Sequence, residues 1–122
     1  MKLSVLITDN LGLDSNYTAM YQFAQADLLL EQHQYERAFT LYDSINKAFP
    51  AHGLADEILL RKAQAMQYLG KWQEALDYLN KIVTYYMNDI LSDDAIFMMA
   101  EIYEKNLHNK EKAAEYYKKI LF

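Results

Sequence analysis

The chain has 122 residues, which is enough for one domain and too few for two ordinary ones. It is 52% hydrophobic, which excludes a disordered chain, and its three Gly and one Pro disfavour an all-β domain that needs many tight turns. A net charge of −5 without a Lys/Arg run argues against nucleic-acid binding, and the lack of Cys excludes disulfides and thiolate metal sites. We therefore expect an all-α protein.

The N-terminal residues 1–18 stand apart from the rest of the chain. The apolar run Met1–Ile7 is cut by Thr8 and Asp9 and lacks a small-residue cleavage site, so a signal peptide is not expected. We interpret 1–18 as the remnant of a preceding helix or an N-terminal extension. No apolar stretch reaches the roughly 18–20 residues that a membrane helix needs. We expect a soluble chain without membrane insertion, cytoplasmic or periplasmic.

From residue 19 onwards the sequence repeats with one period. Alanines recur at intervals of 37 and 37 (Ala26, Ala63, Ala100) and of 37 and 38 (Ala38, Ala75, Ala113). Isoleucines follow the second pattern (Ile45, Ile82, Ile120). A fixed period of this length is typical of helical repeat proteins. It predicts three units at about 19–53, 56–90 and 93–122.

Each unit is predicted to be a pair of helices. In chain order we expect helices near 15–32, 35–48, 54–69, 72–86, 93–106 and 110–121, from apolar residues at helical spacing. Gly70 is predicted to cap the third helix. Pro50 is predicted to interrupt the chain between units, and Ser92–Asp94 to provide the N-cap of the fifth helix. The third unit carries one extra residue before Lys110.

Three segments carry a family resemblance. Residues 69–76 (Leu-Gly-Lys-Trp-Gln-Glu-Ala-Leu) resemble the turn signature of a tetratricopeptide repeat, and 33–38 repeat it with His in place of Gly. Residues 110–117 resemble the second helix of that repeat. The resemblance implies a right-handed α–α superhelix, a solenoid of about three hairpins. The period of 37–38 residues is longer than that of the usual tetratricopeptide repeat. Together with residues 55–59 and 93–97, it resembles the C-terminal repeats of Bacteroidetes-like proteins. This narrower resemblance implies a bacterial protein and a fragment of a longer array.

No constellation of residues indicates catalysis. His33, His52 and His108 fall in separate turns and do not share a helix face. The adjacent Asp93 and Asp94 would point about 100° apart on a helix and cannot jointly hold a proton or an ion. There is no glycine-rich phosphate loop, nucleophile elbow or EF-hand spacing. We therefore expect no enzyme, no catalytic residues, no cofactor and no metal.

The aromatic residues make up 14% of the chain, and 11 of them are Tyr. Most fall at repeat positions where the hairpin core is expected, and Arg and Lys are not interleaved with them as in a base-stacking surface. We predict core positions for Tyr35, Tyr42, Trp72, Tyr103 and Tyr117.

The resemblance also implies a binding surface, because the first helices of stacked repeats line a concave groove in that family. The expected groove residues are Phe23, Asp27, Leu30, Glu57, Leu60, Gln64, Gln67, Tyr68, Asp94, Phe97, Glu101 and Glu104. One subclass grips the carboxylate terminus of chaperone tails with Lys and Asn. The matching positions here carry Phe or Leu and Asp, Gln or Glu, which disfavours that ligand.

We therefore predict a scaffold that binds a protein or peptide segment with apolar anchors and some basic residues. An alternative is that residues 1–13 or a neighbouring repeat covers the apolar strip Phe23–Leu60–Phe97. A second alternative is a structural module of a larger array that self-associates through its terminal helices, for example as a homodimer through the C-terminal helix. The sequence does not identify the partner.

Overall fold

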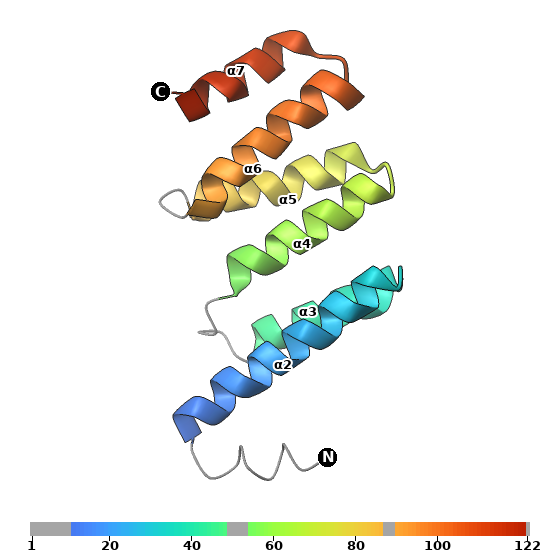
Figure 1. Cartoon of the computed structure of the whole chain (residues 1–122), viewed down its shortest axis with the longest axis vertical. Helices are drawn as coiled ribbons and strands as arrows, with labels where there is room; N and C mark the ends of the chain where they lie inside the picture. The colour runs from blue at the N-terminus through green and yellow to red at the C-terminus, as the bar shows by residue number, and fades with distance from the viewer. Residues whose placement is uncertain (1–10, 49–53, 87–89, 122) are drawn as a thin grey trace. The chain divides into compact units, whose positions relative to one another are not determined.

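A computed structural model describes residues 11–48, 54–86 and 90–121, with the side chains of 11–16 and 121 excepted. These residues form helices and no strand, which confirms the all-α expectation. The elements, shown in Figure 1, are α2 (Leu11–Glu31), α3 (Tyr35–Ala48), α4 (Ala55–Tyr68), α5 (Trp72–Tyr85), α6 (Ile90–Glu101), the π-helix η1 (Ile102–Asn106) and α7 (Lys110–Leu121). The chain divides into two compact units, unit 1 up to Ala55 and unit 2 from Asp56 onwards.

Unit 1 is a hairpin in which α2 packs against α3. On α3 the fully buried residues Ala38, Tyr42 and Ile45 follow the spacing of one helix face, so this face forms the contact. Ala26 of α2 is also fully buried. Because Ala26 and Ala38 have only a methyl side chain, the two helices can approach closely.

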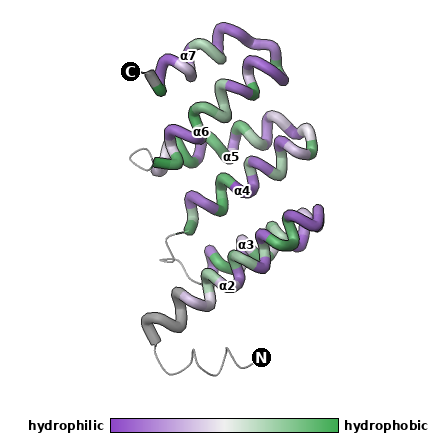
Figure 2. The backbone as a smooth tube through the Cα atoms, in the orientation of Figure 1, coloured by the Kyte–Doolittle hydropathy of each residue, from purple (hydrophilic) through white to green (hydrophobic). Residues whose placement is uncertain are grey.

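Unit 2 continues the same pattern through α4, α5, α6, η1 and α7. α5 packs on α6, and α6 packs on α7. The alanines that the repeat predicted as close-packing positions are 0–3% exposed, namely Ala63, Ala75, Ala100 and Ala113. Figure 2 shows hydrophobic residues along the second half of α6 and hydrophilic residues at the start of α7.

The hairpin turns share a left-handed residue after the first helix. The φ angle is +75° at Gly70, +62° at His33 and +54° at His108. At Gly70 the N–H groups of residues 70 and 71 donate to the carbonyls of residues 67 and 66, which is a Schellman cap, and His33 is closed in the same way. The predicted cap at Gly70 is confirmed, and His replaces Gly in the other two turns.

The extra residue of the third unit is accommodated in η1. From the buried Ala of the first helix to the left-handed residue there are seven positions in the first two units (26 to 33, 63 to 70) and eight in the third (100 to 108). From the left-handed residue to the next buried Ala there are five positions in all three units (33 to 38, 70 to 75, 108 to 113). A residue inserted into a helix is absorbed as a π-turn, so the hairpin turn keeps its length.

Several expectations differ from the structure at the ends of elements. α2 begins at Leu11, so residues 11–18, which we interpreted as part of an extension, belong to its first turns. α6 begins at Ile90, and Ser92 is a 3% exposed residue inside the helix, so the predicted N-cap at residues 92–94 is wrong. Pro50, His52 and the other residues of both breaks lie outside the described residues.

The aromatic core is smaller than predicted. Among the five residues expected in the core, only Tyr42 is fully buried. The other four are half-buried, namely Tyr35, Trp72, Tyr103 and Tyr117. These four side chains are therefore partly accessible to solvent and not enclosed in the core.

Candidate functional site

The expected groove residues of unit 2 form two rows. Glu57, Leu60, Gln64 and Gln67 follow i, i+3, i+7 and i+10 along α4, with Tyr68 beside them. Asp94, Phe97, Glu101 and Glu104 follow the same spacing along α6 and η1, and we call these four residues the acidic face. The two rows lie on the first helices of successive hairpins.

Side-chain exposure separates these residues into two groups. Tyr68 is 69% exposed and Phe97 is 47% exposed, and Gln64, Asp94 and Glu104 are also exposed. Leu60 is only 7% exposed, so it adds little surface for a partner. Phe97 is therefore the apolar residue of unit 2 that is best placed to contact a ligand.

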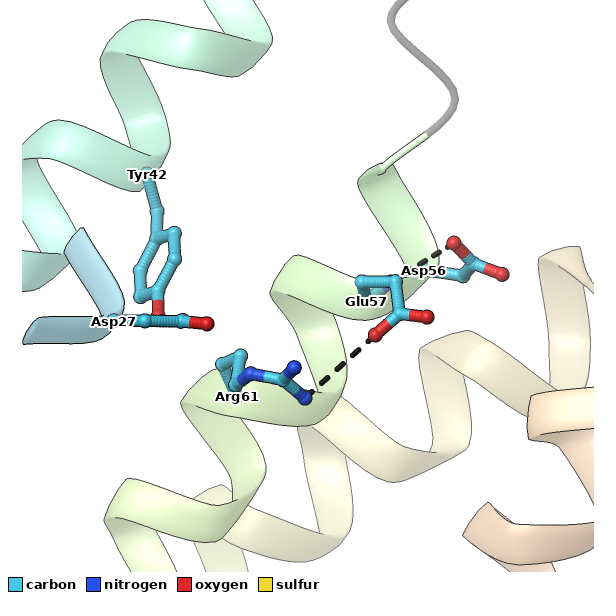
Figure 3. Close-up of polar contacts among 5 residues, drawn as sticks. All are labelled: Asp27, Tyr42, Asp56, Glu57 and Arg61. Carbon is cyan, nitrogen blue, oxygen red and sulfur yellow. Dashed lines mark hydrogen bonds and ion pairs between the residues drawn. The ribbon is translucent and has the colours of Figure 1, made fainter. Parts of the chain in front are cut away.

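The carboxylates of both rows stay accessible although some of them are paired. Glu57 lies 3.6 Å from Arg61 one turn along α4, as Figure 3 shows, and Glu101 lies 3.1 Å from Lys105. Pairs of this i, i+4 kind at a surface contribute roughly 0.3–0.5 kcal/mol. Such a weak pair does not prevent the carboxylate from meeting a cation on a partner.

The acidic face is held in place by an aromatic side chain of α7. The Tyr117 hydroxyl donates a 2.9 Å hydrogen bond to Glu104, and the Tyr117 ring packs edge-on against Phe97 at 5.8 Å between centroids. Partial burial, followed by this hydrogen bond and by the charges of Glu104 and Glu101, raises the pKa of the Tyr117 hydroxyl above its usual value. Tyr117 therefore keeps its proton at neutral pH and positions both Phe97 and Glu104.

Unit 1 contains a closely similar arrangement. The ring of Phe23 lies 5.7 Å from that of Tyr42, and the Tyr42 hydroxyl donates to the carboxylate of Asp27, toward which it points in Figure 3. The middle hairpin has Leu79 at the position of this tyrosine, and Leu79 has no hydroxyl to donate. The neutral Gln64 stands there at the position of Asp27.

The remaining expected residues, Phe23, Asp27 and Leu30, lie on α2 and are half-buried. They belong to unit 1, whereas Leu60 and Phe97 belong to unit 2. The joint strip Phe23–Leu60–Phe97 therefore stays a prediction.

Lysine–tyrosine contacts between η1 and α7 were not predicted. Tyr103 and Tyr116 stack at 5.5 Å, with Lys112 5.8 Å from the first ring and Lys119 4.5 Å from the second. Burial, and next the proximity of Tyr116, raises the pKa of the Tyr103 hydroxyl. The repeated Tyr-x-x-Lys spacing, also present at Tyr78, was the available signal. Such contacts stabilise a surface by about 0.5–1 kcal/mol each.

A shallow hollow of about 440 Å³ lies on unit 1, and none of its lining residues is an expected groove residue. It is lined mainly by α3, with Leu29, Glu36, Arg37, Thr40, Leu41 and Ser44. Only Leu29 and Leu41 of these six residues are apolar, fewer than the predominantly apolar lining that small-molecule pockets usually offer. We assign no ligand to it.

Metal-binding geometry is not found in the part of the chain that the structure describes, where no group of three or more His, Asp or Glu side chains could hold an ion. His33 and His108 occupy the separate left-handed turn positions described above. None of the described helices is long and apolar enough to cross a membrane.

A family model described as tetratricopeptide repeat matches residues 57–88 and 94–121. The chain carries two tetratricopeptide repeats. They coincide with the two hairpins of unit 2, and the fold is the all-α, solenoid-type arrangement of hairpins that this family adopts. Among curated proteins and solved structures, none matches this chain. Tetratricopeptide repeats generally mediate protein–protein interactions and are not catalytic. The likeness to Bacteroidetes-type proteins stays a prediction.

Proposed function

We propose that this protein is an interaction scaffold whose first helices in unit 2, α4 and α6, bind a segment of a partner protein. The observation that carries the proposal is the acidic face, in which the 47% exposed ring of Phe97 lies among the carboxylates of Asp94, Glu101 and Glu104. An exposed aromatic ring offers an anchor point, and the carboxylates around it favour a cation.

The partner that fits this surface has apolar side chains flanked by Lys or Arg. Gln64 and Tyr68 on α4 are exposed and can add hydrogen bonds and aromatic contact at the neighbouring row. A partner rich in carboxylates would meet repulsion from the acidic face. An acidic segment or a free carboxylate terminus is therefore disfavoured.

The alternative of a homodimer through the C-terminal helix receives less support. The exposed residues of α7 are mostly charged, with Lys110, Glu111, Lys112, Glu115, Lys118 and Lys119 among them. Dimer interfaces are usually depleted of charged residues at their centre. We therefore favour the acidic face over α7 as the binding surface.

The test is binding of synthetic peptides by fluorescence anisotropy. Peptides with Leu or Phe anchors and Lys or Arg are expected to bind, and the same peptides with Glu in place of the basic residues are not. Phe97→Ala and the pair Glu101→Gln/Glu104→Gln are each expected to weaken binding about tenfold, which corresponds to about 1.4 kcal/mol. Leu60 is avoided because its burial makes substitution a folding defect.

The matched control is Glu111→Gln/Glu115→Gln, which removes the same charge from exposed positions of α7. It is expected to leave binding unchanged. Equal binding of the acidic peptides, or equal losses in the control and in the Glu101/Glu104 pair, would contradict the proposal.

A further inference from the structure

The hairpin turns of unit 2 expose apolar side chains beside lysines. We call Leu69, Lys71, Leu107, His108 and Lys110 the tip surface; all five are exposed, with Leu69 at 42% and Leu107 at 40%. They lie where α4 turns into α5 and where η1 turns into α7. Since η1 contacts α5 and α6 packs on α5, both turns lie at the same edge of unit 2, as Figure 1 shows.

The charge of this edge is opposite to that of the chain. Residues 67–73 and 105–111 contain three Lys, one His and one carboxylate, Glu111, although the whole chain has 17 acidic and 12 basic residues. The corresponding turn of unit 1, residues 30–36, contains two Glu and no Lys. The basic character is therefore a property of the unit 2 turns and not of the hairpin turn as such.

Helix stability does not explain the lysines. Lys71 is the N-cap residue of α5 and makes no side-chain cap hydrogen bond, and Lys110 is the first residue of α7. A cation is unfavourable at the positive end of a helix dipole, and Ser, Thr, Asp or Asn is preferred as the N-cap. Residues that break such a local rule often serve an interaction instead.

A surface of opposite charge is present on the same chain. The acidic face, Asp94, Phe97, Glu101 and Glu104, combines carboxylates with an exposed ring, and the tip surface combines lysines with two exposed leucines. The tip surface thus has the chemistry that the acidic face is proposed to accept from a partner.

We propose that the tip surface of one copy of this protein docks on the acidic face of a second copy. This inference rests on the proposed function, because it uses the same face. Lys71 and Lys110 of one copy meet Glu101 and Glu104 of the other, and the leucines pack on Phe97. The contact is head-to-tail, so it builds chains of copies rather than a closed dimer. It also competes with any other partner of the acidic face.

Sedimentation velocity of the full 122-residue chain tests the proposal. At low salt the average mass is expected to rise above the monomer mass of 14.3 kDa as protein concentration increases toward about 1 mM. It is expected to return to the monomer mass near 1 M salt, where the screening length falls to about 3 Å.

Two variants separate the surfaces. Lys71→Asp/Lys110→Glu reverses the tip surface, and Glu101→Lys/Glu104→Lys reverses the acidic face. Each variant alone is expected to stay monomeric. Their mixture is expected to associate again, because the intact acidic face of the first variant accepts the intact tip surface of the second, and the two reversed surfaces are again opposite in charge.

The control Lys47→Glu/Lys118→Glu makes the same total change in charge at exposed lysines that are not part of the tip surface. It is expected to associate like the wild type. Circular dichroism monitors folding, and Lys71→Asp is expected to raise helix stability, since Asp is a good N-cap. Loss of association in that variant would then not result from unfolding.

A wild-type chain that stays monomeric up to about 1 mM at low salt overturns the inference. Association that survives either reversal, or a mixture that stays monomeric, overturns it as well. The proposed function is judged separately by the basic peptides, so peptide binding by a strictly monomeric chain leaves that function standing. Self-association without peptide binding would instead remove the proposed function.

Discussion

Replacing His108 with Gly is expected to stabilise unit 2. His108 holds a left-handed backbone with φ of +54°, the conformation that Gly70 holds at the equivalent turn with φ of +75°. This conformation costs a residue with a Cβ roughly 1–2 kcal/mol. About 0.4–1 kcal/mol of that gain is lost, because glycine increases the conformational entropy of the unfolded chain. The net expectation is about 0.5–1 kcal/mol of added stability.

The other two turns provide internal controls. A Cβ placed on Gly70 would meet no atom within 4 Å, so Gly70→Ala tests the backbone cost alone and is expected to lose about 1 kcal/mol. The ring of His33 makes a 2.8 Å hydrogen bond with the Tyr35 hydroxyl. His33→Gly loses that contact and is expected to gain less stability than His108→Gly.

Urea unfolding followed by circular dichroism measures all three variants, and thermal unfolding is expected to shift by about 4–8 °C per kcal/mol for a domain of this size. If His108→Gly were neutral or destabilising while Gly70→Ala was destabilising, the reasoning would be wrong. The left-handed conformation at His108 would then carry no strain, and the hydrogen bonds from residues 107 and 109 back into η1 would have to depend on the histidine.

Three further outcomes are expected. Tyr42→Phe removes a buried hydroxyl from a carboxylate on α2 and should lower the free energy of unfolding by about 1–3 kcal/mol in urea titrations, whereas Tyr117→Phe, at a more exposed site, should cost under about 1 kcal/mol. The raised pKa values of Tyr103 and Tyr117 favour the protonated form in the folded state, so their contribution to the free energy of unfolding is complete below the unfolded pKa of about 10. This contribution is lost as pH rises through the higher folded pKa values. Urea unfolding at alkaline pH should show the loss of stability, and a Tyr103→Phe/Tyr117→Phe variant should show less of it. Ala100→Leu overpacks a 0% exposed contact and should cost about 1–3 kcal/mol, while Ala114→Leu at an exposed position of α7 should change little in the same thermal unfolding assay.

Much of the fold was predictable because the small residues that helix packing requires recur at a fixed interval in the sequence. Ala26, Ala63 and Ala100 had to be small for two helices to approach, and their spacing along the chain is enough to locate the hairpins. The cap at Gly70 was predictable for a related reason, since only glycine adopts a left-handed conformation at no steric cost. The start of α6 was not predictable from the sequence, because Ser92 is a residue type typical of an N-cap but is buried within the helix.

The candidate site was less predictable than the fold. The positions of Leu60 and Phe97 on their helices are equivalent, yet Leu60 is 7% exposed and Phe97 is 47% exposed. Helical spacing gives the direction of a side chain and not what covers it. The link between Tyr117 and Glu104 also depends on η1, whose extra residue alters the register of the helix.

The sequence by itself determined that the chain is all-α, that it repeats every 37 or 38 residues, and that alanines form the hairpin contacts, because these features arise from short-range spacing. Only the tertiary structure decided where the extra residue of the third unit goes. It lies in η1 and not in the turn, because a π-helix absorbs one residue while the buried alanines stay in register. It also decided that Phe97 is exposed beside Glu101 and Glu104, because exposure depends on neighbouring helices that no local pattern describes.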